Sequence, residues 1–171
     1  MITNIELLIN RYQKYMHVLN YSERTVNEYV RLLGHFTEYL TERSIQSIQN
    51  VTKADILDYQ KHVYYQKTSK GHVLRPRSQN NFLRTVKCFY KFLYEEGYVS
   101  QNPARDVHYA KVGRRLPQNI LSKAEVDRIF SVIDINTTLG YRDRTILEVL
   151  YSTGIRRDEL GKLTLNDIDY E

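Results

Sequence analysis

The sequence predicts a mainly α-helical protein, and three observations support this fold class. Glycine and proline are scarce, with 7 and 3 copies in 171 residues, which favours long helices over frequent turns. Apolar residues recur at every third or fourth position through several long stretches. Residues that cap helices, such as Ser22 and Thr52, stand directly before two of these stretches.

Three helices are expected in the first part of the chain. Over residues 4–19, one helical face is apolar. That face carries Ile5, Leu8, Ile9, Tyr12, Tyr15, Met16 and Leu19. A second helix should begin after Ser22, with Glu23 in its first turn, where a carboxylate stabilises the helix dipole. A third should begin after Thr52.

A fourth helix is expected over residues 77–96. Gly71 and Pro76 break the helical pattern before it. Gly97 suits its C-terminal end, because glycine adopts the left-handed conformation that often terminates helices. Together these four helices predict a compact first domain over residues 1–100.

The stretch that follows is expected to be an interdomain linker over residues 101–120. It holds two prolines and a glycine, is basic, and lacks a sustained apolar period. After it, "LSKAEVDRIFSVI", with Ser122 as a capping residue, and "GYRDRTILEVLYST" predict two more helices. Residues 121–171 are therefore expected to begin a second domain.

The composition favours a polyanionic partner and a reducing compartment. The net charge is +5 and the sequence pI is about 9.2, which favours nucleic acid over a membrane surface. Cys88 is the single cysteine, so an internal disulfide is impossible, and we expect a buried thiol in the cytoplasm. "MITNIELLIN" has neither the basic start of a signal peptide nor the length of a membrane span. The five histidines lack the spacing of a metal site.

The fourth predicted helix has a basic face with charges of one sign. No acidic residue occurs between Lys61 and Tyr94. A solvated helix usually mixes charges, because like charges repel and i,i+4 ion pairs stabilise it. The pattern therefore favours a partner that supplies negative charge, although a solvated basic face that touches nothing is the alternative. Arginine and asparagine are also suited to reading base edges in the major groove.

Candidate DNA-binding residues extend from this face to the start of the second helix and to the linker. They are Arg24, Thr25, Arg75, Arg77, Asn80, Asn81, Arg84, Lys87, Lys91, Lys111, Arg114 and Arg115.

The segment "STGIRRDEL" predicts a helix junction next to two arginines. Gly154 ends one helix, and Arg156 and Arg157 stand at the start of the next. Helix N-termini carry free N–H groups, so an arginine there is placed to grip a phosphate. A plain helix–turn–helix with surface arginines is the alternative interpretation of these residues alone.

Two segments of the second half resemble the tyrosine recombinase/integrase family. "LSKAEV" and "TGIRRDELGKLTLNDI" match the beginning of its catalytic domain. The matching residues are Leu121, Ser122, Glu125, Val126, Thr153, Gly154, Ile155, Arg156, Glu159, Leu160, Leu163, Asp167 and Ile168. "YSERTVNEYVRLLGHFTEYL" and "RSQNNFLRTVKCFYKFLYEEGYVSQNPA" resemble the family's core-binding domain.

The resemblance implies a four-helix, SAM-like core-binding domain, a basic linker and the first helices of a mixed α/β catalytic domain. It implies a site-specific recombinase that acts on double-stranded DNA through a 3′-phosphotyrosyl intermediate, without metal or nucleotide cofactor. Arg156 matches the first catalytic arginine, which contacts the scissile phosphate, and Glu159 would hold it in place. Self-association on DNA is implied for the full-length protein.

The sequence departs from the family pattern after Arg156. The family's downstream lysine, its H-x-x-R segment and its nucleophilic tyrosine have no counterpart between Arg156 and Glu171. We therefore expect these 171 residues to bind DNA but to be inactive alone. A standalone DNA-binding protein, perhaps a regulator or a competitor of a full recombinase, and a helical module that binds an acidic protein are the alternatives.

Overall fold

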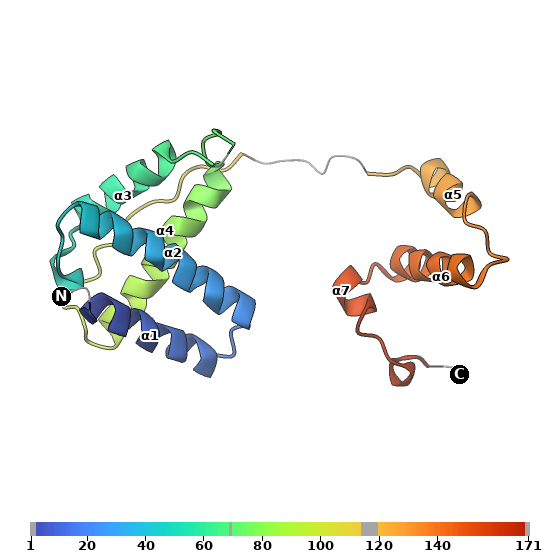
Figure 1. Ribbon diagram of the computed structural model, residues 1–171, viewed down its shortest axis with the longest axis horizontal. Helices are drawn as coiled ribbons and strands as arrows, with labels where there is room; N and C mark the ends of the chain where they lie inside the picture. Colours follow the sequence, from blue (N-terminus) through green and yellow to red (C-terminus); the bar gives the residue numbers. More distant parts are fainter. Residues whose placement is uncertain (1–2, 69, 114–119, 170–171) are drawn as a thin grey trace. The chain divides into compact units, whose positions relative to one another are not determined.

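The computed structural model describes residues 3–68, 70–113 and 120–169, which are mainly helical (Figure 1). Within these ranges the only β-structure is an isolated bridge between Lys67 and Val73. The mainly α-helical prediction is confirmed. The chain divides into two compact units, Met1–Arg114 and Arg115–Glu171.

Helices α1 (Thr3–Val18) and α2 (Glu23–Glu42) pack against each other. Ser22 caps α2 as predicted, because its side-chain oxygen accepts a hydrogen bond from the Thr25 N–H at 3.3 Å. The apolar faces of both helices point into the first unit, which buries Tyr12 and Phe36.

Helix α3 (Lys53–Tyr65) follows a 3-10 turn (Ile48–Asn50), and Thr52 caps it as predicted. Helix α4 (Pro76–Glu95) begins at a proline, whose missing N–H costs nothing in a first turn. It contacts α2, which crosses it, and α3 (Figure 1). Gly97, at φ 75°, follows its end, so the predicted helix 77–96 is confirmed to within one residue.

The first unit has a continuous apolar core that all four helices build. Tyr59, Tyr90, Phe36 and Phe89 are its largest fully buried side chains. Aromatic rings meet in several pairs, including Phe36 with Tyr59 at 4.8 Å between ring centroids. Burial of rings this large is a main source of folding free energy.

Residues 99–110, here called the strap, pack on the first unit instead of leaving it. Val99, Ala104 and Val107 are buried within the core. The sequence analysis expected a linker from residue 101 onward, whereas residues 101–110 lie against the helices. Helical periodicity could not predict this contact, because Val99, Ala104 and Val107 lie on a segment of bends and turns and have no helical spacing.

The second unit contains α5 (Lys123–Ser131), α6 (Thr138–Thr153), the single turn α7 (Arg157–Leu160) and a 3-10 turn (Leu165–Asp167). Ser122 caps α5 as predicted. No residue of the described range 120–169 is fully buried. None of the helices in the described ranges has the length and apolarity that a bilayer crossing requires.

Candidate nucleic-acid interface

The start of α4 and the loop before it form an exposed basic surface. Arg75 and Arg77 are exposed at the first turn of α4. The preceding loop adds Lys67 and Lys70, also exposed, and is closed by a hydrogen bond of 2.7 Å from the Thr68 N–H to the His72 carbonyl. The sequence analysis did not select these two lysines, although they lie within the acid-free stretch that it identified.

Arg84 lies about two helical turns beyond Arg77 on α4 and contacts Tyr29 of α2. It is exposed, and its guanidinium lies 6.0 Å from the centroid of the Tyr29 ring. Partial burial raises the pKa of Tyr29, and the neighbouring Arg84 opposes this shift. A cation over an aromatic face loses little hydration and keeps its donors for a partner. Arg24 and half-buried Thr25 lie one turn earlier on α2.

The remaining candidates of the first unit differ in their contacts. Asn81 and Lys111 are exposed. Lys91 forms a surface ion pair with Glu95 at 3.7 Å, which a phosphate can replace at small cost. Arg114 and Arg115 lie outside the described residues.

Asn80 and Lys87 make contacts within the chain that the sequence analysis did not anticipate. The Asn80 side chain exchanges two hydrogen bonds with the backbone of Ala110, at 2.9 and 2.8 Å. The Lys87 ammonium donates to the carbonyls of Arg105 and Val107, at 3.0 and 2.7 Å. Backbone acceptors have no signature in side-chain spacing, so no sequence signal pointed to these bonds.

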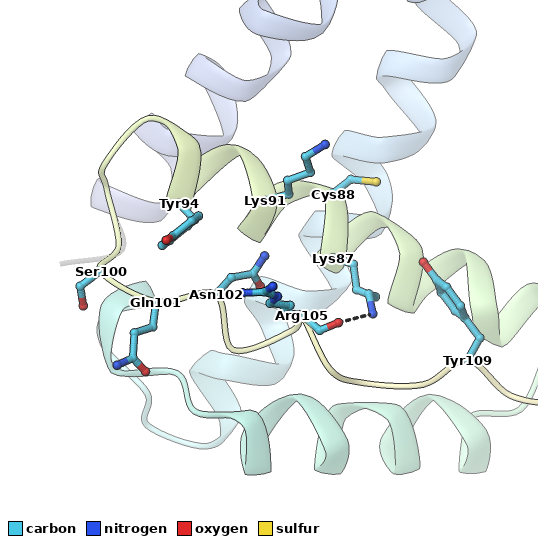
Figure 2. Close-up of a pocket in the computed structure, with 9 residues that line it drawn as sticks. All are labelled: Lys87, Cys88, Lys91, Tyr94, Ser100, Gln101, Asn102, Arg105 and Tyr109. Atoms are coloured by element: carbon cyan, nitrogen blue, oxygen red, sulfur yellow. Dashed lines mark hydrogen bonds between the residues drawn. The ribbon is translucent and has the colours of Figure 1, made fainter.

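A basic groove of about 660 Å³ lies between α4 and the strap (Figure 2). Its lining includes the cations Lys87, Lys91 and Arg105 and no carboxylate. Cys88 also lines it and is half-buried, so the expected burial of this thiol is only partial. In the described ranges, no three His, Cys, Asp or Glu side chains are placed to hold a metal ion.

The junction of the second unit has the predicted backbone geometry. Gly154 adopts φ 66°, and its N–H donates to the Leu150 carbonyl at 3.1 Å, which ends α6. Arg156 is the residue directly before α7. The glycine is needed here because other residues adopt this conformation only with strain.

Glu159 holds Arg156 through both its backbone and its side chain. The Arg156 N–H donates to Oε2 of Glu159 at 3.0 Å, and its Nη1 donates to Oε1 at 2.9 Å. These hydrogen bonds lower the pKa of Glu159, the backbone bond most strongly. The Arg156 side chain is 84% exposed, so most of the guanidinium remains open to a partner. Arg157 pairs with Asp158 instead.

Comparison with known proteins extends over both units. Residues 9–97 match the phage integrase N-terminal SAM-like domain, and residues 119–171 match the phage integrase family. The chain belongs to the phage integrase family. Its SAM-like match covers α2 to α4 completely, and the match to the integrase family contains the Arg156 junction. The family resemblance inferred from the sequence is thereby confirmed.

Several curated proteins similar to this chain are tyrosine recombinases. The chain is 36% identical over 170 residues to the tyrosine recombinase XerC of Oceanobacillus iheyensis, covering 99% of this chain and 53% of that protein. It is 38% identical over 152 residues to XerC 2 of Ralstonia nicotianae, covering 89% and 44%. For XerC of Bacillus subtilis the identity is 30% over 167 residues, covering 97% and 53%. The integrase-family chain thus spans about half the length of these relatives.

Proposed function

We propose that this chain is the DNA-binding portion of a site-specific tyrosine recombinase. The observation that carries the proposal is the exposed basic surface of the first unit within an integrase-family domain. Arg75, Arg77 and Arg84 are exposed along α4, and the stretch from residue 62 to 94 contains no carboxylate. Such a surface lacks internal charge partners and suits the phosphates of duplex DNA.

The surface combines phosphate contacts with side chains that can read bases. Arginines bind phosphate or guanine through two parallel hydrogen bonds, and asparagine suits adenine. Asn81 lies in the first half of α4, between Arg77 and Arg84. On the neighbouring helix α2, Arg24 and Thr25 are the proposed DNA contacts. Lys111 is a further proposed phosphate contact, and Arg114 and Arg115 are proposed to contact phosphates as well.

In the complete recombinase, we assign Arg156 to the scissile phosphate. A tyrosine oxygen attacks the phosphorus, forms a 3′-phosphotyrosyl bond and releases the 5′-hydroxyl strand. Negative charge develops on the phosphate oxygens in this step, and a fixed arginine stabilises it. Glu159 orients Arg156 through the two hydrogen bonds described above.

The proposed reaction needs no metal or nucleotide, because the covalent intermediate conserves the energy of the phosphodiester. It takes place in the cytosol on double-stranded DNA, with self-association of full-length subunits on that DNA. A helical module that binds an acidic protein is the competing class of function, and DNA affinity separates the two.

Salt-dependent binding to duplex DNA tests this proposal. The affinity of the 171-residue chain should fall steeply with salt, and Arg77→Ala and Arg84→Ala together should weaken binding. Each lost phosphate contact should flatten the log–log salt slope by about 0.9. Lys14→Ala, at an exposed position of α1, is the control and should leave the slope unchanged. DNA binding that does not depend on salt concentration would contradict the proposed interface. An unchanged salt slope in the double variant would exclude α4 from it.

A further inference from the structure

Asn80 and Lys87 lie on the basic side of α4, yet their polar atoms face the strap. Asn80 closes a pair of hydrogen bonds with Ala110, donating to its carbonyl and accepting from its N–H. Lys87 bridges the carbonyls of Arg105 and Val107, and Figure 2 shows its ammonium directed toward the strap. Its ammonium also lies 5.3 Å from the centroid of the Tyr109 ring.

Helix α3 also holds the strap through a side-chain hydrogen bond. The Gln60 side chain of α3 donates to the His108 carbonyl at 2.9 Å. Beneath these bonds, Ala104 and Val107 are buried, with exposed fractions of 0% and 2%. Asn80, Lys87 and Gln60 all donate to backbone carbonyls of the strap. The position of the strap along the helices therefore depends on its backbone and its buried residues. Its exposed side chains do not take part in these bonds.

We propose that Asn80 and Lys87 form a clamp that fixes where the chain leaves the first unit. In this role they are positioning residues that act through the strap and do not contact DNA. The clamp holds the chain against the first unit as far as Ala110. That the basic face of α4 binds DNA without Asn80 and Lys87 rests on the proposed function.

The clamp adds to the contacts that Gln60, Ala104 and Val107 already make. It acts on the last residues of the strap, where Asn80 holds the backbone of Ala110.

Amide hydrogen exchange without DNA tests the clamp directly. Asn80→Ala removes the acceptor of the Ala110 N–H, so exchange at this amide should rise by about tenfold or more while the core of α1–α4 stays protected. Lys87→Met keeps the apolar stem and should raise exchange and proteolysis within residues 105–110. Lys87→Arg keeps a donor and should restore protection.

Arg84→Met is the matched control, since Arg84 lies one turn from Lys87 and contacts Tyr29. It should leave strap exchange unchanged and flatten the DNA salt slope by about 0.9, whereas Lys87→Met should leave the slope unchanged. Unchanged exchange in both Asn80→Ala and Lys87→Met would overturn the clamp, as would a flattened slope in Lys87→Met. If no variant and no wild-type chain binds DNA, the proposed function fails, while the exchange result still decides the clamp.

Discussion

The two units of the chain have similar local structure and very different burial. Thr52 in the first unit and Ser122 in the second each form a capping box with the residue three positions later. The backbone N–H to carboxylate distance is 2.8 Å in both. Yet the first unit buries a continuous core, and the second fully buries no residue of the described range 120–169.

This difference teaches that helix signals and a core are separate properties of a sequence. Capping residues and periodicity determine where helices begin and end, whereas stability comes mainly from buried apolar area. In the second unit Leu139, Ile146 and Leu165 remain exposed. The Arg144 guanidinium instead covers the Phe130 ring at 4.5 Å and donates to the Phe130 carbonyl at 2.8 Å. Such contacts order a helix pair but bury little area.

Hydrogen exchange of the 171-residue chain should show the largest difference between the two units. Core amides of α2 and α4 open only with the unfolding of the first unit, so they should exchange about a thousandfold or more slower than amides of α5 and α6. The measurement is site-resolved exchange at neutral pH. Equal protection in the two units would show that the second one is covered, for instance by another copy of the chain.

Truncating one apolar side chain in each unit should give very different losses of stability. Phe89 is 0% exposed, and Phe89→Ala should lower the free energy of unfolding by about 3–5 kcal/mol. Ile146 is 37% exposed, and Ile146→Ala should cost about 1 kcal/mol or less. Denaturant titration of both variants measures these losses, and a comparable cost for Ile146→Ala would mean that a core forms around α6.

The two units should also separate DNA binding from DNA cleavage. In a chain joined to the remaining part of a tyrosine recombinase catalytic domain, Arg156→Ala should lower strand cleavage by about a hundredfold or more, because it removes a transition-state donor. DNA affinity should change little. Trapping the covalent tyrosyl–DNA adduct reports the cleavage rate. Arg157→Ala is the control, and an Arg156→Ala chain that cleaves at the wild-type rate would exclude the assignment.

The first unit should be the more sensitive of the two to high pH. Burial raises the pKa of Tyr12, Tyr59 and Tyr90 above 10, so their contribution to stability is complete below about pH 10 and is lost as pH rises further. Hydrogen bonds lower the pKa of Glu125 and Glu159, so their contribution is complete above about pH 4.5 and is lost as pH falls. Circular dichroism and exchange against pH should show the first unit failing in base and the helix starts of the second failing in acid.

Matched removal of the two capping residues should produce the smallest effect. Thr52→Ala should lower the free energy of global unfolding by about 0.5–2 kcal/mol, because α3 is part of the cooperative core. Ser122→Ala should shorten or fray α5 without shifting the global transition. NMR chemical shifts of residues 122–126 and the denaturation midpoint report the two effects. A shift of the global midpoint in Ser122→Ala would mean that both units unfold together.

Local features of this fold were predictable from the sequence, and long-range ones were not. Ser22, Thr52 and Ser122 were expected as caps and are caps, and Gly154 has the expected left-handed conformation. The helical period also placed Tyr12 and Met16 on an apolar face, and both are buried in the core. These features depend on residues within a few positions of each other, which a sequence displays directly.

The contacts of the strap and of the Arg156 junction show which contacts could be predicted from the sequence and which could not. Asn80 and Ala110 are 30 positions apart, and the bond joins a side chain to backbone atoms that every residue possesses. Basic periodicity therefore placed Asn80 and Lys87 with the DNA-binding candidates and left their bonds to the strap unseen. The pairing of Arg156 with Glu159 was foreseeable, because it spans three positions at a helix start.

The strap also bears on how recombinase domains can be exchanged in protein engineering. The family match of the first domain ends at residue 97, but the apolar interior of the unit continues to Val107. A chimaera joined at residue 97 would replace Val99, Ala104 and Val107 with side chains of foreign volume, and burying a valine alone contributes about 1.5–3 kcal/mol. A junction placed after Ala110 keeps the native packing and lets either half be interchanged as a module.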